Sequence, residues 1–161
     1  MNAFLDLPNA SPGEADVILL PLPFEGTVSY GRGTARGPAA ILDASRQVET
    51  FDEETGCELD KLTYCWADEV HPVEGQGADL YLDKVLQTAA AAHGQRGFVI
   101  GVGGEHSVTA PLAEAASGSA DLSDLTIVQF DAHADLRDSY EDSKSSHACV
   151  MRRLLDRGAS I

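Results

Sequence analysis

The stretch that decides the fold is "TIVQFDAHADLRD", residues 126–138. A continuous apolar run stops at residue 130, and then Asp131, His133 and Asp135 occupy alternate positions. Continuous apolar character is typical of a strand that is buried on both faces of a parallel sheet. Because alternate side chains of an extended segment point the same way, we expect these three to converge, although a turn after residue 131 would change the details.

The rest of the sequence alternates between apolar runs and segments with helical signals. We expect strands within 15–26, 62–70, 97–104 and 125–133, and helices within 38–51, 77–94, 106–117 and 146–158. The polar segment 52–61 is expected to form a turn or a short excursion. This order is typical of an α/β domain, in which helices cover both faces of a mostly parallel sheet and sites form at the carboxyl ends of the strands. We therefore expect residues 1–161 to belong to a single domain.

Composition narrows the class of protein. Of the 161 residues, 43% are hydrophobic and 23% are charged, which is typical of a globular domain. No apolar run reaches the ~18–20 residues that a membrane span needs, and the amino terminus does not resemble a secretory signal, so a cytoplasmic location is the default. The net charge of −15 argues against nucleic-acid binding, which requires Lys and Arg.

Neither the cysteines nor the glycine-rich segment predicts a separate chemistry. The three cysteines are widely spaced and form no C-x-x-C pair, which argues against a zinc ribbon or a disulfide framework. Cys149 lies near His147, but we interpret it as a buried thiol rather than a nucleophile. The segment 26–37 is rich in glycine, yet it contains neither G-x-G-x-x-G nor a Walker lysine, so it does not predict a nucleotide site.

Two further histidines occupy positions that suit chemistry. In "GVGGEHSVT" (101–109) a predicted strand ends at two glycines and His106 follows; it is either a metal ligand or a histidine at a helix start, and the nearby D-x-H-x-D pattern favours the metal. His147 begins a predicted helix, and the residues alone leave open whether it relays a proton or caps that helix. Carboxylate and imidazole ligands suit Mn²⁺, Zn²⁺ or Fe²⁺.

Taken together, these motifs resemble the ureohydrolase family, which includes arginases and agmatinases. The resemblance rests on "GGEHS", "DAHADLRD" and "SHACVMRR", in this order and spacing, and on "EGTVSYGRGTARGPAAILDAS" near the amino terminus, which is most like bacterial agmatinases. It implies a three-layer α/β/α arginase-like fold and two manganese ions. It also implies hydrolysis of a guanidino compound to urea and an amine.

The resemblance assigns roles to individual residues. It implies that His106 and Asp135 bind one manganese ion, that His133 binds the other, and that Asp131 bridges the two. His147 corresponds to the proton-relaying histidine of the family. In the family, a hydroxide shared by the two ions attacks the guanidinium carbon, and the leaving amine receives the relayed proton.

Part of the family pattern is not found in residues 1–161. A later S-x-D-x-D segment supplies two further aspartate ligands in the family, and "GASI" (158–161) reads as the beginning of another strand. We therefore expect the chain to be the amino-terminal portion of a longer enzyme, with the carboxy-terminal part of the fold missing. At full length we expect a homo-oligomer. The 161-residue chain alone is expected to bind manganese weakly and to have weak or no activity.

Agmatine, hydrolysed to putrescine and urea, is the expected substrate. The stretch "LRDSYEDSKSS" (136–146) resembles agmatinases rather than arginases, in which this region helps to hold the amino-acid end of arginine. Within it, Arg137 is a candidate ion-pair partner of Asp138 or Glu141. A small cationic guanidino substrate also suits the acidic chain. The alternatives are a ureohydrolase of guanidinobutyrate or arginine, a non-catalytic remnant or interaction module of the same fold, and a metal-dependent deacetylase on a similar fold.

Overall fold

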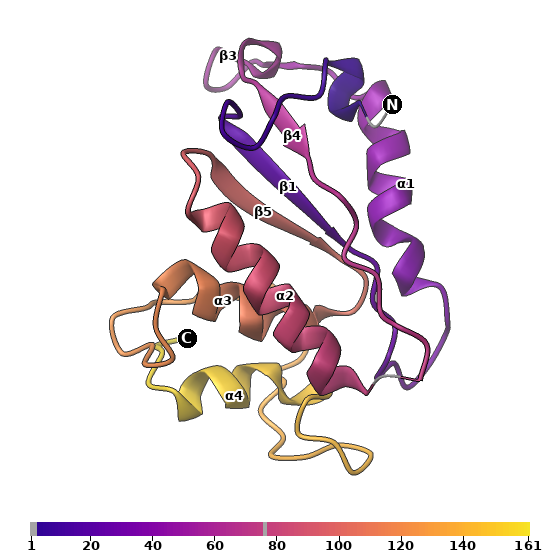
Figure 1. Cartoon of the computed structure of the whole chain (residues 1–161), viewed down its shortest axis with the longest axis vertical. Coiled ribbons are helices and arrows are strands. Elements are labelled where there is room, and N and C mark those ends of the chain that lie inside the picture. The colour runs from indigo at the N-terminus through magenta and orange to yellow at the C-terminus, as the bar shows by residue number, and fades with distance from the viewer. Residues whose placement is uncertain (1–2, 76) are drawn as a thin grey trace.

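A parallel sheet forms the centre of the computed structural model, which describes residues 3–75 and 77–161. Strand β1 (Val17–Leu22) lies between β4 (Tyr64–Trp66) and β5 (Phe98–Gly103), as Figure 1 shows. β1 pairs with β5 over its whole length, up to the pair Leu22 and Gly103, so both strands end at the same edge of the sheet. Because β1 is flanked on both sides, its apolar run is almost entirely buried.

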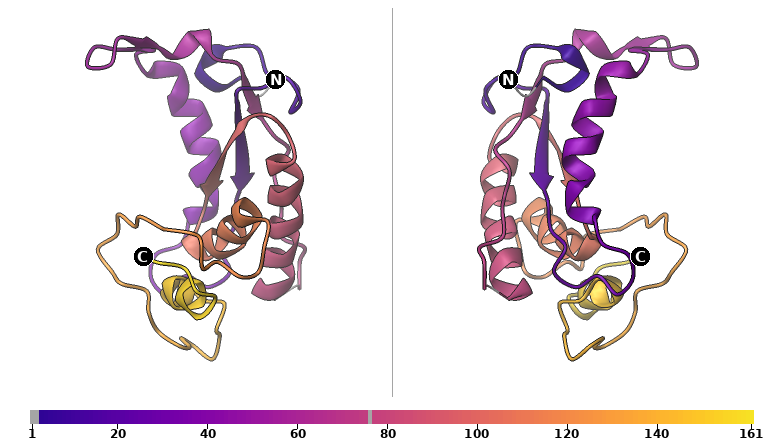
Figure 2. Two further views of the ribbon diagram at one scale, coloured as in Figure 1. Left: turned by 90° about the vertical axis from the view of Figure 1, so that its left-hand side faces the viewer. Right: turned by 90° about the vertical axis from the view of Figure 1, so that its right-hand side faces the viewer.

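Helices cover both faces of this sheet. α1 (Gly37–Ala44) lies on one side of the strands, and α2 (Ala78–His93) and α3 (Thr109–Ser117) lie on the other, as the two views in Figure 2 show. Alternation along β1 explains the layers, because Leu19 packs toward α1 while its neighbours Ile18 and Leu20 pack toward α2. The expected three-layer α/β/α arrangement with a mostly parallel sheet is confirmed.

Helix α2 shows why these segments are helical. The prediction placed it within 77–94, and it spans Ala78–His93, with Gly94 directly after its last residue. Its buried residues recur at helical spacing and face the sheet. They are Tyr81, Val85, Ala89 and Ala92.

A smaller core joins the last helix to the rest. Helix α4 (Val150–Asp156) buries Met151 and Leu154 against α3 and Leu122. Short 3₁₀ turns, His106–Val108 and His147–Cys149, lead directly into α3 and α4. His106 and His147 therefore each lie at the first residue of a turn that leads into a helix.

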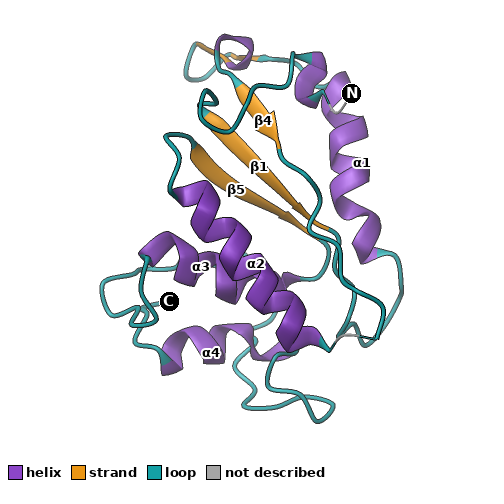
Figure 3. Ribbon diagram, in the orientation of Figure 1, coloured by secondary structure: helices purple, strands orange, loops and turns teal. Residues whose placement is uncertain are grey.

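The polar segment 52–61 forms a short excursion, as expected, and contributes to a small antiparallel hairpin of β2 (Phe51–Asp52) and β3 (Cys57–Glu58). Another segment differs from its prediction. The strand predicted within 125–133 does not form; Figure 3 shows that region as loop, and its pairing is a single parallel bridge between Thr126 and Ser160.

The physical reason for the missing strand is its lack of neighbours. A β-strand requires hydrogen-bonding partners along its edges, and apolar character alone does not supply them. Beyond the bridge at Thr126, the segment has no ladder partner among residues 3–75 and 77–161, and the side chains of Val128 and Phe130 are 73% and 97% exposed.

None of the helices in these two ranges is long and apolar enough to span a membrane.

Candidate metal centre

The site begins where β1 and β5 end together. After β5, the backbone N–H of Gly104 donates to the carbonyl oxygen of Leu22 at 2.9 Å, and that of Glu105 donates to Phe24 at 2.9 Å. The approach is so close that a Cβ atom at Gly104 would lie 2.1 Å from the carbonyl oxygen of Phe24. Glycine is therefore required at this position, and the chain leaves the strand with His106 directly at the edge of the sheet.

His106 meets two carboxylates at this edge. Nitrogen or oxygen atoms of His106, Asp131 and Asp135 all lie within 4.8 Å of one another. The His106 Nε2 atom is 3.5 Å from Asp135 Oδ2, and the Asp135 side chain is only 9% exposed. Gln129 also donates from its Nε2 to Asp135 Oδ2 at 3.3 Å. One imidazole and two carboxylates thus form a group that could hold a metal ion.

His133 lies beside this group but does not join it. The backbone N–H of His133 donates to Asp131 Oδ1 at 2.9 Å, which closes a turn immediately after residue 131. The His133 Nδ1 atom is 3.6 Å from the same oxygen, and its side chain is 82% exposed. The turn, rather than extended alternation, determines where this side chain points. The metal-binding role of His133 stays a prediction.

The backbone of the loop is held against the last helix. The backbone N–H of Arg137 donates to the carbonyl oxygen of Ala148 at 3.2 Å. The backbone N–H of Arg152 donates to the backbone carbonyl oxygen of Asp135 at 3.3 Å. Asp135 itself adopts a left-handed backbone conformation, with φ of 48°. Asp adopts this conformation more readily than most residues with a side chain. With its side chain only 9% exposed, the Asp135 carboxylate points inward from the loop.

Hydrogen bonds and nearby charges lower the pKa of two carboxyl groups of the loop, Asp131 and Asp138. The hydrogen bond from the His133 backbone, followed by the nearby His106 and His133 rings, holds the pKa of Asp131 below its usual value. Arg153 donates to Asp138 at 2.8 Å and, with Lys144, lowers the pKa of Asp138. Asp131 is therefore available as an anionic ligand at neutral pH.

The expected ion pair of Arg137 is not present in the described part of the chain. Its guanidinium carbon lies 4.7 Å from the centre of the Tyr140 ring instead. Asp138 is already paired with Arg153 and Lys144, which leaves the aromatic face as the better partner for the cation.

His147 faces an open cavity next to the metal group. This cavity, of about 520 Å³, lies between the 133–140 loop and the start of the His147 turn, and its walls include His133, Asp135 and Tyr140. The ring centres of His147 and His106 are 6.4 Å apart, and the Tyr140 ring meets His147 edge-on at 5.8 Å. His147 is therefore placed beside the proposed ligands without being one of the three that converge.

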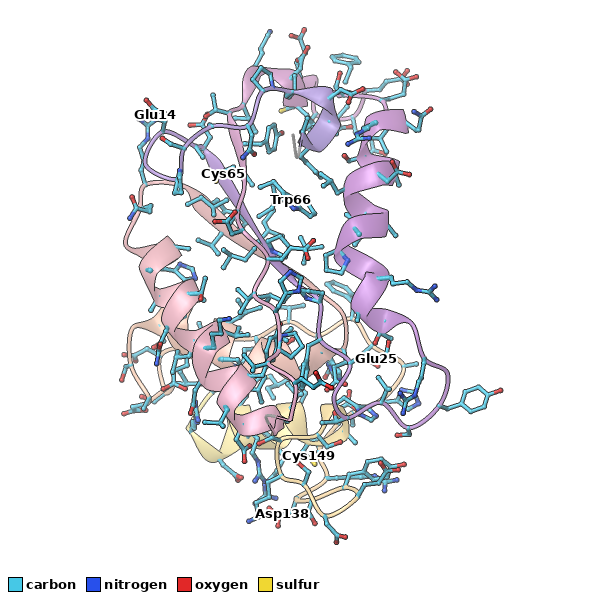
Figure 4. The ribbon with its side chains drawn as sticks, turned by 45° about the vertical axis from the view of Figure 1, so that its right-hand side comes forward. Glu14, Glu25, Cys65, Trp66, Asp138 and Cys149 are labelled. Carbon is cyan, nitrogen blue, oxygen red and sulfur yellow. The ribbon has the colours of Figure 1, made fainter. Side chains whose placement is uncertain are left out.

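Backbone amides of the glycine-rich segment 26–37 donate to the carboxylate of Glu25, the residue just before it. Glu25 accepts hydrogen bonds from the backbone of Gly33 at 2.5 Å and of Ala35 at 3.2 Å, and these bonds lower the pKa of Glu25. Figure 4 shows Glu25 at the same end of the molecule as Asp138 and Cys149, opposite Glu14. The glycine-rich segment thus lies at the same end of the sheet as the candidate metal centre. Two of its backbone amides are used in hydrogen bonds to Glu25.

Cys149 does not act with His147 in this arrangement. Its thiol is buried, it points toward the carbonyl oxygen of Ser143 at 3.7 Å, and burial raises its pKa. A thiol with a raised pKa is a poor nucleophile. The interpretation of Cys149 as a buried thiol is confirmed.

Sequence reasoning did not identify two polar residues next to the site. Glu105 is only 5% exposed, and its carboxylate accepts hydrogen bonds from the backbone N–H of Thr27 at 2.7 Å, the Thr27 hydroxyl at 2.5 Å and the Ser107 hydroxyl at 2.8 Å. The only available signal was the position of Glu105 between Gly104 and His106. Its partner Thr27 belongs to a distant loop that no local pattern connects to it.

Comparison with known proteins agrees with this fold. The model of the arginase family matches residues 15–160, and the chain belongs to that family. Among curated proteins, the N(1)-aminopropylagmatine ureohydrolase of Synechocystis sp. is 37% identical over 153 residues, which cover 92% of this chain and 49% of that protein. The agmatinase of Pyrococcus horikoshii is 34% identical over 158 residues, covering 98% of this chain and 53% of that protein.

A solved structure shows the same likeness in three dimensions. The agmatine ureohydrolase of Thermoplasma volcanium superposes with a TM-score of 0.78 and 31% identity, covering 97% of this chain and 50% of that one. The arginase-like fold and the resemblance to agmatinases are thereby confirmed. The chain spans about half the length of the curated relatives that it matches.

Proposed function

We propose that this chain supplies the amino-terminal part of a manganese-dependent ureohydrolase that releases urea from agmatine. The observation that carries the proposal is the meeting of His106, Asp131 and Asp135 at one edge of the sheet, with His147 beside them. N(1)-aminopropylagmatine is the second candidate substrate, because the relative from Synechocystis is named for it. Both candidates are linear cations that end in a guanidinium group.

The residues present fit a divalent metal ion. Two carboxylates and one imidazole suit Mn²⁺, and the Asp131 carboxylate stays ionised because its pKa is lowered by the His133 backbone hydrogen bond. His106, Asp131 and Asp135 would hold the metal, with His133 as a further candidate next to Asp131. When bound, such ions lower the pKa of water and so supply a nucleophile at neutral pH.

The remaining residues would hold and orient the substrate. The cavity of about 520 Å³ beside His147 has the volume of an ordinary small-molecule site. The net charge of −15 favours the approach of a cation. An imidazole can accept and donate a proton near neutral pH, so His147, at the wall of this cavity, is suited to deliver a proton to the leaving amine.

A urea assay tests the proposed function. The polypeptide encoded by the reading frame extended beyond Ile161, loaded with Mn²⁺, is incubated with agmatine, N(1)-aminopropylagmatine, arginine and guanidinobutyrate. We expect urea from agmatine or its aminopropyl derivative, little from the other two, and little from residues 1–161 alone. Absence of urea with all four substrates would favour the non-catalytic remnant and overturn the proposal. Preference for arginine or guanidinobutyrate would overturn the substrate assignment.

A further inference from the structure

We propose that Glu105 and Thr27 are positioning residues that hold neutral His147 in the tautomer protonated at Nδ1. This tautomer leaves Nε2 with a free lone pair. The tautomer is inferred from hydrogen-bond geometry. Its role in relaying a proton rests on the proposed function. The three residues come from three separate segments: the loop after β1, the end of β5 and the turn before α4.

The argument starts with the direction of the Thr27 hydroxyl. Three donors surround the buried Glu105 carboxyl group, namely the Thr27 N–H, the Thr27 hydroxyl and the Ser107 hydroxyl. All three groups donate to the carboxylate oxygens of Glu105, which act as acceptors. The Thr27 hydroxyl has a single hydrogen, and the distance of 2.5 Å from its oxygen to Glu105 Oε1 commits that hydrogen to Glu105.

The Thr27 oxygen can then only accept from His147. A hydroxyl oxygen has two lone pairs, and the backbone N–H of His147 uses one of them at 3.0 Å. The Nδ1 atom of the same residue lies 3.3 Å from this oxygen. A hydrogen bond forms there only if Nδ1 carries the proton, because the Thr27 hydroxyl has no second hydrogen to give. With that bond made, the donor and both acceptor positions of Thr27 are filled.

The other polar neighbours of the ring do not oppose this tautomer. Ser146 Oγ is 3.4 Å from Nδ1, and its hydroxyl can either donate or accept, so it does not dictate the proton position. Ser29 Oγ is 3.4 Å from Nε2, and it can donate to an unprotonated nitrogen. Glu105 is buried, whereas Ser29 is exposed, so water competes less for the contacts at the Nδ1 side of the ring.

The consequence is a ring with two different ends. Nδ1 is occupied by a structural hydrogen bond, while Nε2 remains free to take up a proton and pass it on. In the opposite tautomer, Nε2 would already carry its proton and the contact between Nδ1 and Thr27 would be lost. Glu105 thus acts on His147 indirectly, because it fixes the direction of the Thr27 hydroxyl, which in turn contacts Nδ1 of His147.

Nuclear magnetic resonance tests the tautomer without any activity measurement. The 161-residue chain is labelled with ¹⁵N-histidine, freed of metal with EDTA and studied at alkaline pH, where imidazoles are neutral. Long-range ¹H–¹⁵N spectra then identify the protonated nitrogen of each ring, with His147 assigned from a His147→Gln variant. The matched pair is Thr27→Val, which keeps the shape but removes the oxygen, and Thr27→Ser, which keeps the oxygen. Circular dichroism reports whether each variant is folded.

We expect the Nδ1–H form in the wild-type chain and in Thr27→Ser. In Thr27→Val the ratio of Nδ1–H to Nε2–H should fall by roughly two- to tenfold, as expected for one lost hydrogen bond. Finding the Nε2–H form in the wild-type chain would overturn the proposal. So would finding the same ratio of Nδ1–H to Nε2–H in the wild-type chain, Thr27→Val and Thr27→Ser. So would a shift in Ser146→Ala that Thr27→Val does not produce. If Thr27→Val fails to fold, the proposal is tested on the tautomer of the wild-type chain and on the ratio in Thr27→Ala, which should fall in the same way. Since no substrate is present, failure of the urea assay would leave this result untouched.

Discussion

The Nε2 atom of His106 lies 3.5 Å from the Oδ2 atom of Asp135, although the two residues come from different parts of the chain. His106 begins the turn after β5, and Asp135 lies in the loop between α3 and α4. Within the loop, Gln129 donates to the Asp135 carboxylate, and the N–H of Arg152 in α4 donates to the backbone carbonyl oxygen of Asp135. The contact between His106 and Asp135 is what makes the edge of the sheet a candidate metal centre.

His147 should affect turnover and leave the metals in place. In the extended, Mn²⁺-loaded polypeptide, His147→Ala is expected to lower kcat for agmatine by about 10²–10⁴-fold, the usual contribution of a general acid or base. Metal content, measured by atomic absorption, should be unchanged, because His147 is not one of the three converging ligands. The exposed His93, at the end of α2, provides the control variant His93→Ala. Loss of metal on the His147 substitution would mean that its role is misassigned.

Gly104 should be intolerant of a side chain. Gly104→Ala would place a Cβ atom 2.1 Å from the carbonyl oxygen of Phe24, so the strand end must move. We expect a loss of stability of about 1–3 kcal/mol or more, measured by urea unfolding of the chain. Gly13→Ala is the matched control, since its Cβ would meet only Gln95 Oε1, at an ordinary 3.7 Å. Equal stabilities of the two variants would contradict the close approach of β5 to the segment after β1.

The three cysteines should differ in reactivity. Cys57 is exposed, whereas Cys65 and Cys149 are buried and burial raises the pKa of both thiols. Because the thiolate is the reactive form, a disulfide reagent such as DTNB should modify Cys57 rapidly and the other two only after unfolding. Cys57→Ser should remove the fast phase. A fast phase that persists in this variant would show that one of the buried thiols is accessible.

Asp16 should make part of the stability dependent on pH. The backbone and the hydroxyl of Thr63 both donate to its carboxylate, at 3.0 and 2.9 Å, and these bonds hold its pKa below the usual 3.8. A lowered pKa in the folded state stabilises the fold above the unfolded value, and this stabilisation is lost as pH falls through the lowered pKa. The difference in Tm between the wild-type chain and Asp16→Asn should therefore be larger at neutral pH than in acid below 3.8. A difference that does not change with pH would refute this role.

Local signals predicted the elements that their own residues stabilise. The buried run of β1, the helical spacing of Val85 and Ala89, and Gly94 at the end of α2 are all visible in sequence. The prediction of a strand within 125–133 was wrong. A strand depends on hydrogen-bonding partners from other segments, and the local sequence does not show whether they are present.

The candidate site was only partly predictable. His106, Asp131 and Asp135 lie close together, whereas the turn that Asp131 closes with the backbone of His133 directs the His133 side chain elsewhere than extended alternation predicts. Asp often accepts a hydrogen bond from the backbone two residues later, so "DAH" carried a weak signal for that turn. The link from Glu105 through Thr27 to His147 joins distant segments, and no local pattern encodes it.

The most direct test of the candidate metal centre is Mn²⁺ binding to the chain itself. Electron paramagnetic resonance measures free Mn²⁺ in titrations of the wild-type chain, His106→Ala, Asp135→Asn and the control His93→Ala. We expect weak but saturable binding by the wild-type chain and by His93→Ala. The dissociation constant should rise at least about tenfold in the other two variants, because each has lost a ligand. Absence of saturable binding in the wild-type chain, or equal affinity in all four proteins, would contradict a metal centre built on His106 and Asp135.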